Sequence, residues 1–214
     1  MRIIIEREIT SAELVMYALY LYFLGLSFRS TSKAIQLFEE GRSHVAIWKW
    51  VQRFSLKRLY HCKRVSTFLI DETMLQISSI EAWLWVAVEP IHKQNLGVYN
   101  SRHRNMIVVE AFLDSLIRFY GKHTVYINGG SWYPEACRSQ GLKHRLHSPY
   151  EKSIIERTID YLKDRTEAFD DYFPCIRNGL CSLQHVYKWL ILFAFMHNNS
   201  TINKSNTNFI NLRR

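Results

Sequence analysis

Two acids and one amide stand where the chain could build a site for phosphoryl transfer. Asp71 follows an apolar run (FLID, residues 68–71), and Asn128 ends a second one (VYINGG, residues 125–130). Glu156 lies in a charged segment that we expect to be helical. A strand-end acid, a second strand-end polar group and a helix acid are the skeleton of a site that holds two divalent ions roughly 3.5–4 Å apart. The middle position is an amide here, where that chemistry requires a carboxylate.

Side chains of a strand alternate between its two faces, which decides which acids can meet. Asp71 and Thr73 should point to one face of the predicted sheet and Glu72 to the other, so Glu72 does not easily replace Asp71. On the predicted helix, an acid and three charged residues at spacings of four, seven and eight share one side: Glu156, Asp160, Lys163 and Asp164. On this side of the helix, a carboxylate could bind the metal ions while Lys163 contacts the DNA backbone. The same residues could equally form a solvent-exposed surface with ion pairs, which is the commoner outcome for an isolated acidic helix.

The N-terminal third has the spacing of three short helices. Thr10 and Glu13 form a capping box for the first, Ser30 or Ser32 can cap the second, and Ser43 the third. Four apolar residues at helical spacing mark the buried face of the third helix: Ile47, Trp50, Val51 and Phe54. Two helices joined by a short turn that contains glycine form the helix-turn-helix pattern.

The outer face of that third helix carries the residues that we predict to contact DNA. The candidates are Arg42, Ser43, His44, Lys49 and Arg53, with Trp48 and Gln52 on the same face. Such a face suits phosphate and base contacts in a major groove. A plain three-helix bundle with a solvated basic face explains the pattern equally well, and Trp48 also fits a core position. The formal net charge is +9, of which residues 1–67 carry +6, and this asymmetry favours DNA.

The rest of the chain predicts an α/β fold. Strand patterns over 66–77, 82–89 and 95–100 are followed by a helix (105–120), a strand (123–128), a short helix (132–140), a strand (142–147) and helices over about 150–168 and 182–197. This order predicts a ribonuclease-H-like mixed sheet flanked by helices and preceded by a small all-α helix-turn-helix domain. We expect the helix-turn-helix domain over 1–60, the ribonuclease-H-like domain over 61–200 and a frayed polar tail over 201–214.

Composition excludes several other classes. The apolar run over residues 14–26 is shorter than the roughly 20 residues that span a bilayer, so we expect a buried helix and no membrane contact. The four cysteines form no CxxC pair, which argues against a zinc finger or a disulfide framework. His144 and His147 lack a matching cysteine or acid pair, and we interpret them as ordinary strand and loop residues. We expect a cytoplasmic, nucleoid-associated protein.

A longer ordered pattern is more specific than any single acid. It comprises NGGSWYP (128–134), GLKH (141–144), HSP (147–149), ER (156–157) and FDDYFPC (169–175), with WVQRF (50–54) ending the third helix. In these segments the chain resembles the DDE transposases of small prokaryotic insertion sequences, in particular archaeal copies. The resemblance covers roughly residues 12–197.

The resemblance implies a DDE catalytic domain of ribonuclease-H-like fold behind a DNA-binding domain. The implied activity is Mg²⁺- or Mn²⁺-dependent cleavage of DNA at the element ends and transfer of the freed strand to target DNA. The three catalytic positions fall on Asp71, Asn128 and Glu156, of which Asp71 and Glu156 would bind the metal. The implied partners are double-stranded DNA, both terminal inverted repeats and target, and further copies of the chain.

Three functions follow from these observations. The first is a transposase whose activity is weakened or lost because position 128 is an amide. The second is an inactive DNA-binding derivative that occupies element ends or joins active subunits. The third, a ribonuclease-H-like nuclease, fits less well because a nuclease that only trims needs no helix-turn-helix.

Overall fold

The computed structural model describes residues 10–38, 41–54, 65–77, 80–167 and 183–211. The N-terminal helices are α1 (Ala12–Phe23), α2 (Phe28–Ile35), the short 3-10 helix η1 (Gln36–Phe38) and α3 (His44–Arg53). The remaining elements are β1 (Phe68–Ile77), β2 (Ile80–Glu89), β3 (Gln94–Ser101), α4 (Met106–Tyr120), β4 (Val125–Ile127), α5 (Tyr133–Ser139), β5 (His144–Leu146), α6 (Pro149–Glu167) and α7 (Leu183–Asn211). No described helix combines the length and apolar character needed to cross a membrane.

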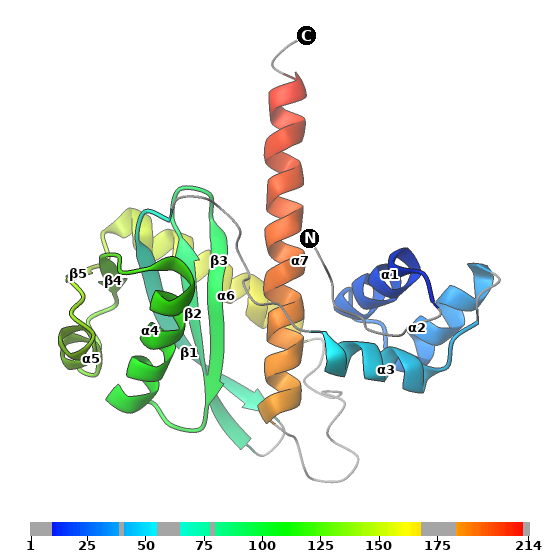
Figure 1. The fold of residues 1–214 in the computed structure, drawn as a ribbon, viewed down its shortest axis with the longest axis horizontal. Coiled ribbons are helices and arrows are strands. Elements are labelled where there is room, and N and C mark those ends of the chain that lie inside the picture. The colour runs from blue at the N-terminus through cyan, green and yellow to red at the C-terminus, as the bar shows by residue number, and fades with distance from the viewer. Residues whose placement is uncertain (1–9, 39–40, 55–64, 78–79, 168–182, 212–214) are drawn as a thin grey trace.

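The five strands form one mixed sheet in the order β3-β2-β1-β4-β5. The hairpin strands β1, β2 and β3 pair antiparallel, whereas β4 and β5 add to β1 in parallel. Helices α4 and α5 cover one face of the sheet and α6 and α7 the other (Figure 1). This arrangement confirms the predicted ribonuclease-H-like sheet flanked by helices. Parallel pairing places the carboxyl ends of β4 and β5 at the same level, beside the middle of β1.

The N-terminal helices form as predicted, but two of their caps differ. Ser11 caps α1 by accepting a hydrogen bond from the Leu14 N–H at 3.3 Å. Thr10, predicted for this role, is buried and accepts from the Arg42 Nε–H at 2.8 Å. Ser27 caps α2, ahead of the predicted serines, because it already has extended backbone after the turn at the end of α1. Ser43 caps α3 as predicted, through the Ala46 N–H at 3.3 Å.

Helix α7 joins the N-terminal helices to the sheet. Figure 1 shows it between α1–α3 and β3, and one hydrophobic core combines side chains of all these elements. Phe54, at the end of α3, packs edge-on against Phe195 of α7 with ring centroids 5.4 Å apart. The predicted boundary at 60/61 lies outside the described residues. Helices α1–α3 nevertheless share their core with the rest of the protein.

The end of α7 differs from the sequence-based expectation. We predicted a helix to about residue 197 and a frayed tail from 201, but the helix continues to Asn211. The segment is rich in asparagine, serine and threonine, which are weak helix formers, yet it contains neither proline nor glycine to end the helix. Figure 1 shows this last part of α7 extending beyond the sheet.

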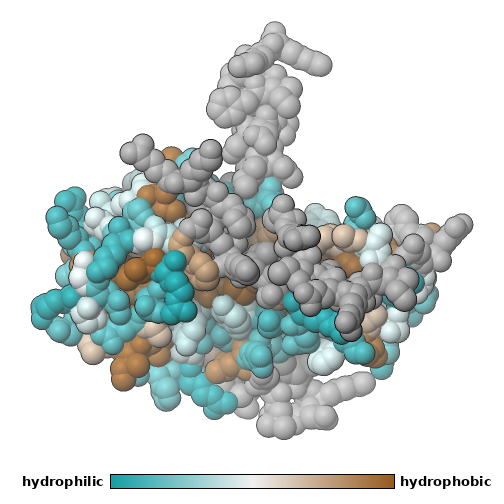
Figure 2. All heavy atoms as spheres, viewed as in Figure 1, coloured by the Kyte–Doolittle hydropathy of each residue, from teal (hydrophilic) through white to brown (hydrophobic). Residues whose placement is uncertain are grey.

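The surface is mixed in character. On the face drawn in Figure 2, hydrophobic residues (brown) form small separate patches among hydrophilic ones (teal). Scattered apolar residues of this kind are normal for a folded protein. The exposed apolar side chains of the N-terminal helices include Leu37, Val45 and Trp48.

A pair of asparagines fixes α7 against β3. The Asn198 side chain accepts a hydrogen bond from the Asn95 N–H at 2.7 Å and donates one to the Asn95 carbonyl at 2.9 Å. Both residues are buried. The two bonds satisfy backbone groups of β3 that would otherwise lack partners in the core.

We therefore predict that Asn198→Ala destabilises the protein by about 2–4 kcal/mol, because two buried backbone groups lose their partners at once. Urea denaturation followed by circular dichroism measures the change. Asn199→Ala is the matched control, since Asn199 bonds only the Phe195 carbonyl one turn earlier in its own helix. An equal loss of stability in both variants would contradict the assigned role of Asn198.

Candidate functional site

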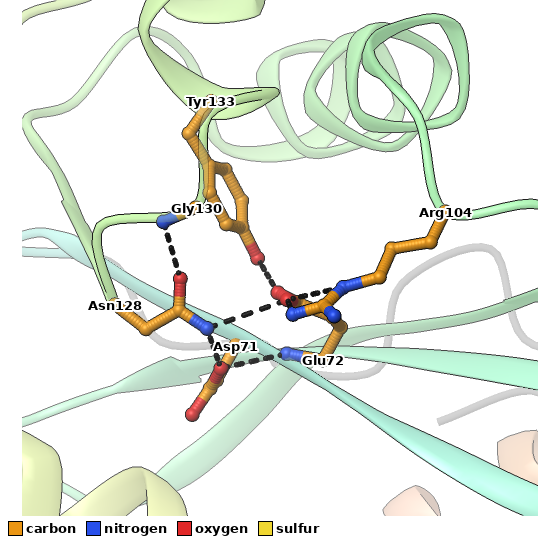
Figure 3. Close-up of polar contacts among 6 residues, drawn as sticks. All are labelled: Asp71, Glu72, Arg104, Asn128, Gly130 and Tyr133. Carbon is orange, nitrogen blue, oxygen red and sulfur yellow. Dashed lines mark hydrogen bonds and ion pairs between the residues drawn. The ribbon is translucent and has the colours of Figure 1, made fainter.

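Strands β1 and β4 bring Asp71 and Asn128 together. Asn128 follows the end of β4 as predicted, but the prediction that Asp71 ends its strand is wrong, because β1 continues to Ile77 through its pairing with β2. Leu69 pairs with Tyr126, so the same parallel register places Asp71 beside Asn128 two residues later. The Asn128 amide nitrogen (Nδ2) donates to Asp71 Oδ1 at 2.6 Å and to Glu72 Oε1 at 3.3 Å. Two of the three predicted catalytic positions therefore meet, and Figure 3 shows this contact.

The turn after β4 fixes the orientation of the Asn128 amide. Its oxygen, Oδ1, accepts the Gly130 N–H at 2.9 Å (Figure 3). The opposite orientation would set the amide NH₂ against the Gly130 N–H and the amide oxygen against two carboxylates. The hydrogen-bond network thus assigns the NH₂ group to the acids. Asn128 presents a donor, and not a metal ligand, to Asp71.

Glu72 is the buried centre of a second network that sequence reasoning missed. Its side chain points to the face opposite Asp71, as predicted, and is buried there. Arg104 donates to Glu72 Oε1 from Nε at 3.0 Å and from Nη2 at 2.6 Å. The Tyr133 hydroxyl donates to Oε2 of the same carboxylate. A buried carboxylate requires partners of this kind, and both come from positions distant in sequence.

Two tryptophans hold Arg104 in place. The guanidinium carbon lies 4.5 Å from the ring centroid of Trp83 and 4.0 Å from that of Trp132, within the range of cation–π attraction. Trp132 also packs on the turn that carries Asn128, since a Cβ atom at Gly130 would lie 2.6 Å from its ring. Glycine is therefore required at position 130. The same cluster that neutralises Glu72 thus sets the position of Asn128.

Burial controls the ionisation of this site. Burial raises the pKa of Asp71 above its ordinary value, and the charge of Glu72 raises it further. The Glu72 N–H, the Asn128 amide and the nearby His147 act in the opposite direction. Burial, followed by the charge of Glu72, raises the pKa of Tyr133 well above its ordinary value, so its hydroxyl stays a donor. The fold therefore disfavours the charged form of Asp71.

Glu156 lies apart from this network. Its helix α6 packs on the sheet through Ile155, Ile159 and Leu162, while the Glu156 side chain is 51% exposed and lies 3.7 Å from Lys152 Nζ. Asp160 and Asp164 are exposed as well, which matches the solvated surface considered above. Within the described residues, no hydrogen bond or ion pair joins Glu156 to Asp71.

These residues do not fit a two-metal centre as they stand. Asp71 Oδ1 accepts the Glu72 N–H at 2.9 Å in addition to the Asn128 amide. Among the described residues, no group of three or more His, Cys, Asp or Glu side chains is arranged to hold a metal ion. The assignment of Mg²⁺ or Mn²⁺ to Asp71 and Glu156 remains a prediction.

The predicted DNA contacts fall into different environments. His44, Trp48, Lys49 and Arg53 are exposed on α3, and Trp48 is 46% exposed, which rules out a core position. Gln52 contacts His185 of α7, with Nε2 and Nδ1 2.6 Å apart. Arg42 is half-buried and tied to Thr10, Ser43 acts as a cap, and Lys163 lies half-buried on α6.

Comparison with known proteins adds one curated relative and several structures. No family model matches the chain. An uncharacterized protein of Methanocaldococcus jannaschii is 29% identical over 201 residues, which cover 92% of this chain and 91% of that protein.

Three similar solved structures are two integrase catalytic core domains and one intasome. The catalytic core domain of BIV integrase is 19% identical with a TM-score of 0.45, over 60% of this chain and 82% of that one. The simian T-cell lymphotropic virus intasome in complex with PP2A regulatory subunit B56 gamma is 16% identical with a TM-score of 0.47, over 82% of this chain and 67% of that one. The HTLV-2 integrase catalytic core domain in complex with magnesium is 18% identical with a TM-score of 0.43, over 58% of this chain and 83% of that one. These TM-scores lie below 0.5, and the fold assignment rests on the strand order.

We predict that Asp71→Asn makes the protein more stable at neutral pH. Because the folded state holds the Asp71 proton more tightly than the unfolded chain does, ionisation of this residue costs stability. The gain should be absent below the unfolded pKa of about 3.9 and should grow as pH rises through the folded pKa.

Urea denaturation at a series of pH values measures this difference. Asp160→Asn, which removes a charge from the exposed side of α6, serves as the control. Loss of stability in Asp71→Asn at neutral pH would show that the Asp71 carboxylate is a net stabilising group.

Proposed function

We propose that the protein is a DNA-binding derivative of the DDE transposases of insertion sequences, with impaired DNA cleavage and strand transfer. One observation carries the proposal: the NH₂ group of Asn128 is fixed on Asp71, at the position where the family has its second carboxylate. A neutral donor there takes the place of an acid that would help to bind a cation. The first two positions of the pattern still meet, but the negative charge of the second is lost.

The charge balance explains why catalysis should be impaired. Two divalent ions need several negative oxygens, and phosphoryl transfer relies on those ions to orient and stabilise the reacting oxygens. In this chain Glu72 is neutralised by Arg104, and Glu156 lies beside Lys152. Of the three catalytic positions, Asp71 then carries the one acid that remains available to a cation. A single carboxylate binds divalent ions weakly.

DNA binding is assigned to the exposed face of α3. His44, Lys49 and Arg53 place polar and basic groups along it, and Trp48 adds an exposed aromatic ring. The second helix of a helix-turn-helix lies in the major groove, where such side chains contact phosphates and base edges. The terminal inverted repeats of the element are the duplexes that this face would bind. Assembly with further copies, as the family implies, belongs to the same proposal.

A second candidate is an active transposase. Asp71 and Asn128 do meet, and these are two of the positions where the family carries its acids, which favours it. It requires the Asn128 amide to turn around, so that its oxygen faces the metal. That movement would break the bond from the Gly130 N–H and leave two donors facing each other.

We predict that Lys49→Ala weakens binding of duplex DNA by the full-length protein. Loss of one phosphate contact should lower affinity for all sequences and reduce the slope of log affinity against log salt by about 1. The whole chain is needed because α1–α3 share their core with α7. Fluorescence anisotropy with duplexes from the DNA that flanks the gene, at several salt concentrations, measures both quantities.

Lys122→Ala is the matched control for Lys49→Ala. It removes the same exposed charge from the segment before β4, which is separated from α7 and α3 by the rest of the sheet. An equal loss of affinity in the two variants would mean that the protein binds DNA through its overall charge and not through α3.

We predict that Asn128→Asp gains metal-dependent nicking of the same duplexes, whereas the natural sequence shows little or none. The new carboxylate would restore the second acid of the pattern and attract a cation. Asn128→Ala should remain inactive. The samples require peptide mapping, because a glycine after asparagine favours spontaneous conversion of Asn128 to aspartate. Strand transfer by the unconverted natural protein at the rate of Asn128→Asp would contradict impaired catalysis.

A further inference from the structure

His147 belongs to the same row of residues as Asp71 and Asn128. In the parallel pair of β4 and β5, Ile127 lies beside Leu146, so Asn128 lies beside His147 one step later. The His147 N–H donates to the Ile127 carbonyl at 2.9 Å, which continues the ladder to this point. Asp71, Asn128 and His147 therefore occupy one level on three neighbouring strands.

Side chains at one level of parallel strands point to the same face of the sheet. For Asp71 this is the face of Leu69, which packs in the core beneath α6 and α7. Tyr126, in β4, packs on the same core, which places Asn128 on that side too. The electrostatic influence of His147 on Asp71 agrees with this placement.

The imidazole of His147 has no partner within the described structure. Both ring nitrogens are buried, and neither makes a hydrogen bond there. A buried donor or acceptor without a partner costs about 1–3 kcal/mol, and such groups often mark the place of an ion or a water molecule. A neutral imidazole offers one nitrogen lone pair, which is a strong ligand for transition metals.

Asp71 supplies an oxygen on the same face. The two hydrogen bonds that fix its carboxylate, from the Glu72 N–H and from the Asn128 amide, both end on Oδ1. Oδ2 takes part in neither of them. One carboxylate oxygen and one imidazole nitrogen are thus available at one level of the sheet, with the strand of Asn128 between them.

We propose that Asp71 and His147 together bind a single transition-metal ion, of the class of Co²⁺, Mn²⁺ or Zn²⁺. A nitrogen ligand favours these ions over Mg²⁺, which prefers an all-oxygen shell. With two protein ligands, the remaining coordination positions would hold water or an oxygen of a bound phosphate. The site differs from the family's metal site because it uses His147 and not Glu156. It also does not depend on the proposed function, since an inactive protein would bind the ion equally well.

The test is a Co²⁺ titration of the full-length protein without a histidine tag, followed by calorimetry and visible absorbance. We expect weak one-to-one binding and no comparable binding of Mg²⁺. His147→Ala should lower the Co²⁺ affinity at least tenfold. His144→Ala is the matched control, because His144 lies on the same strand, is exposed and points to the opposite face. Glu156→Gln should leave the affinity unchanged.

Nuclear magnetic resonance of histidine-labelled protein provides a second readout that does not rely on a variant's stability. Co²⁺ should shift or broaden the ring signals of one of the nine histidines first, and those signals should be the ones missing from His147→Gln. Absence of Co²⁺ binding at millimolar concentration would overturn the proposal. So would an unchanged affinity in His147→Ala, an equal loss in His144→Ala, or a loss in Glu156→Gln with His147→Ala unaffected.

Discussion

The buried Glu72 carboxylate is the constraint on which the site depends. A charge removed from water must be paired, because an unpaired buried charge costs several kcal/mol. The partners are Arg104, just before α4, and Tyr133, the first residue of α5. One side chain of β1 therefore holds the starts of two helices against the sheet. The rings of Trp83 and Trp132 complete the enclosure around Arg104. Because Trp132 lies against Gly130, the same charge also fixes the turn that carries Asn128.

This constraint gives the amide at position 128 a structural meaning. A carboxylate there would contact those of Asp71 and Glu72, and three neighbouring negative charges would repel one another unless cations bound. The amide removes one charge and donates a hydrogen bond to each of the two acids, so it pairs with both within the protein.

The sequence predicts the parts of this structure that depend on local pattern. Alternating and helical periodicity places every strand and helix of the sheet region, and the apolar runs before Asp71 and Asn128 place the two residues on strands. Asn128 follows the end of β4 as predicted, whereas Asp71 lies within β1, because pairing with β2 continues the strand to Ile77. Glu72, Arg104 and Tyr133 were missed because their partnership joins residues 32 and 61 positions apart, and no local pattern reports such a pair. The one usable signal was the alternation of side chains along β1, which places Glu72 on the face of the sheet opposite Asp71. The alignment of His147 with Asp71 and Asn128 could not be predicted, because β5 has only three residues, all of them exposed, and so shows no hydrophobic pattern from which its register could be inferred.

Helix α7 packs between helices α1–α3 and the sheet. Its aromatic side chains pack against the N-terminal helices: the ring centroids of Phe193 and Phe23 lie 5.9 Å apart, and those of Phe195 and Phe54 lie 5.4 Å apart. On β3, the Asn198 side chain exchanges hydrogen bonds with the Asn95 backbone, and the Asn100 side chain donates to the Leu183 carbonyl. Separating α1–α3 from the sheet would expose these rings to water, at about 25 cal/mol for each Å² of apolar surface. The helices that we propose for DNA binding therefore share one hydrophobic core with the ribonuclease-H-like sheet. If α3 binds DNA as proposed, this packing would set the position of the duplex relative to Asp71.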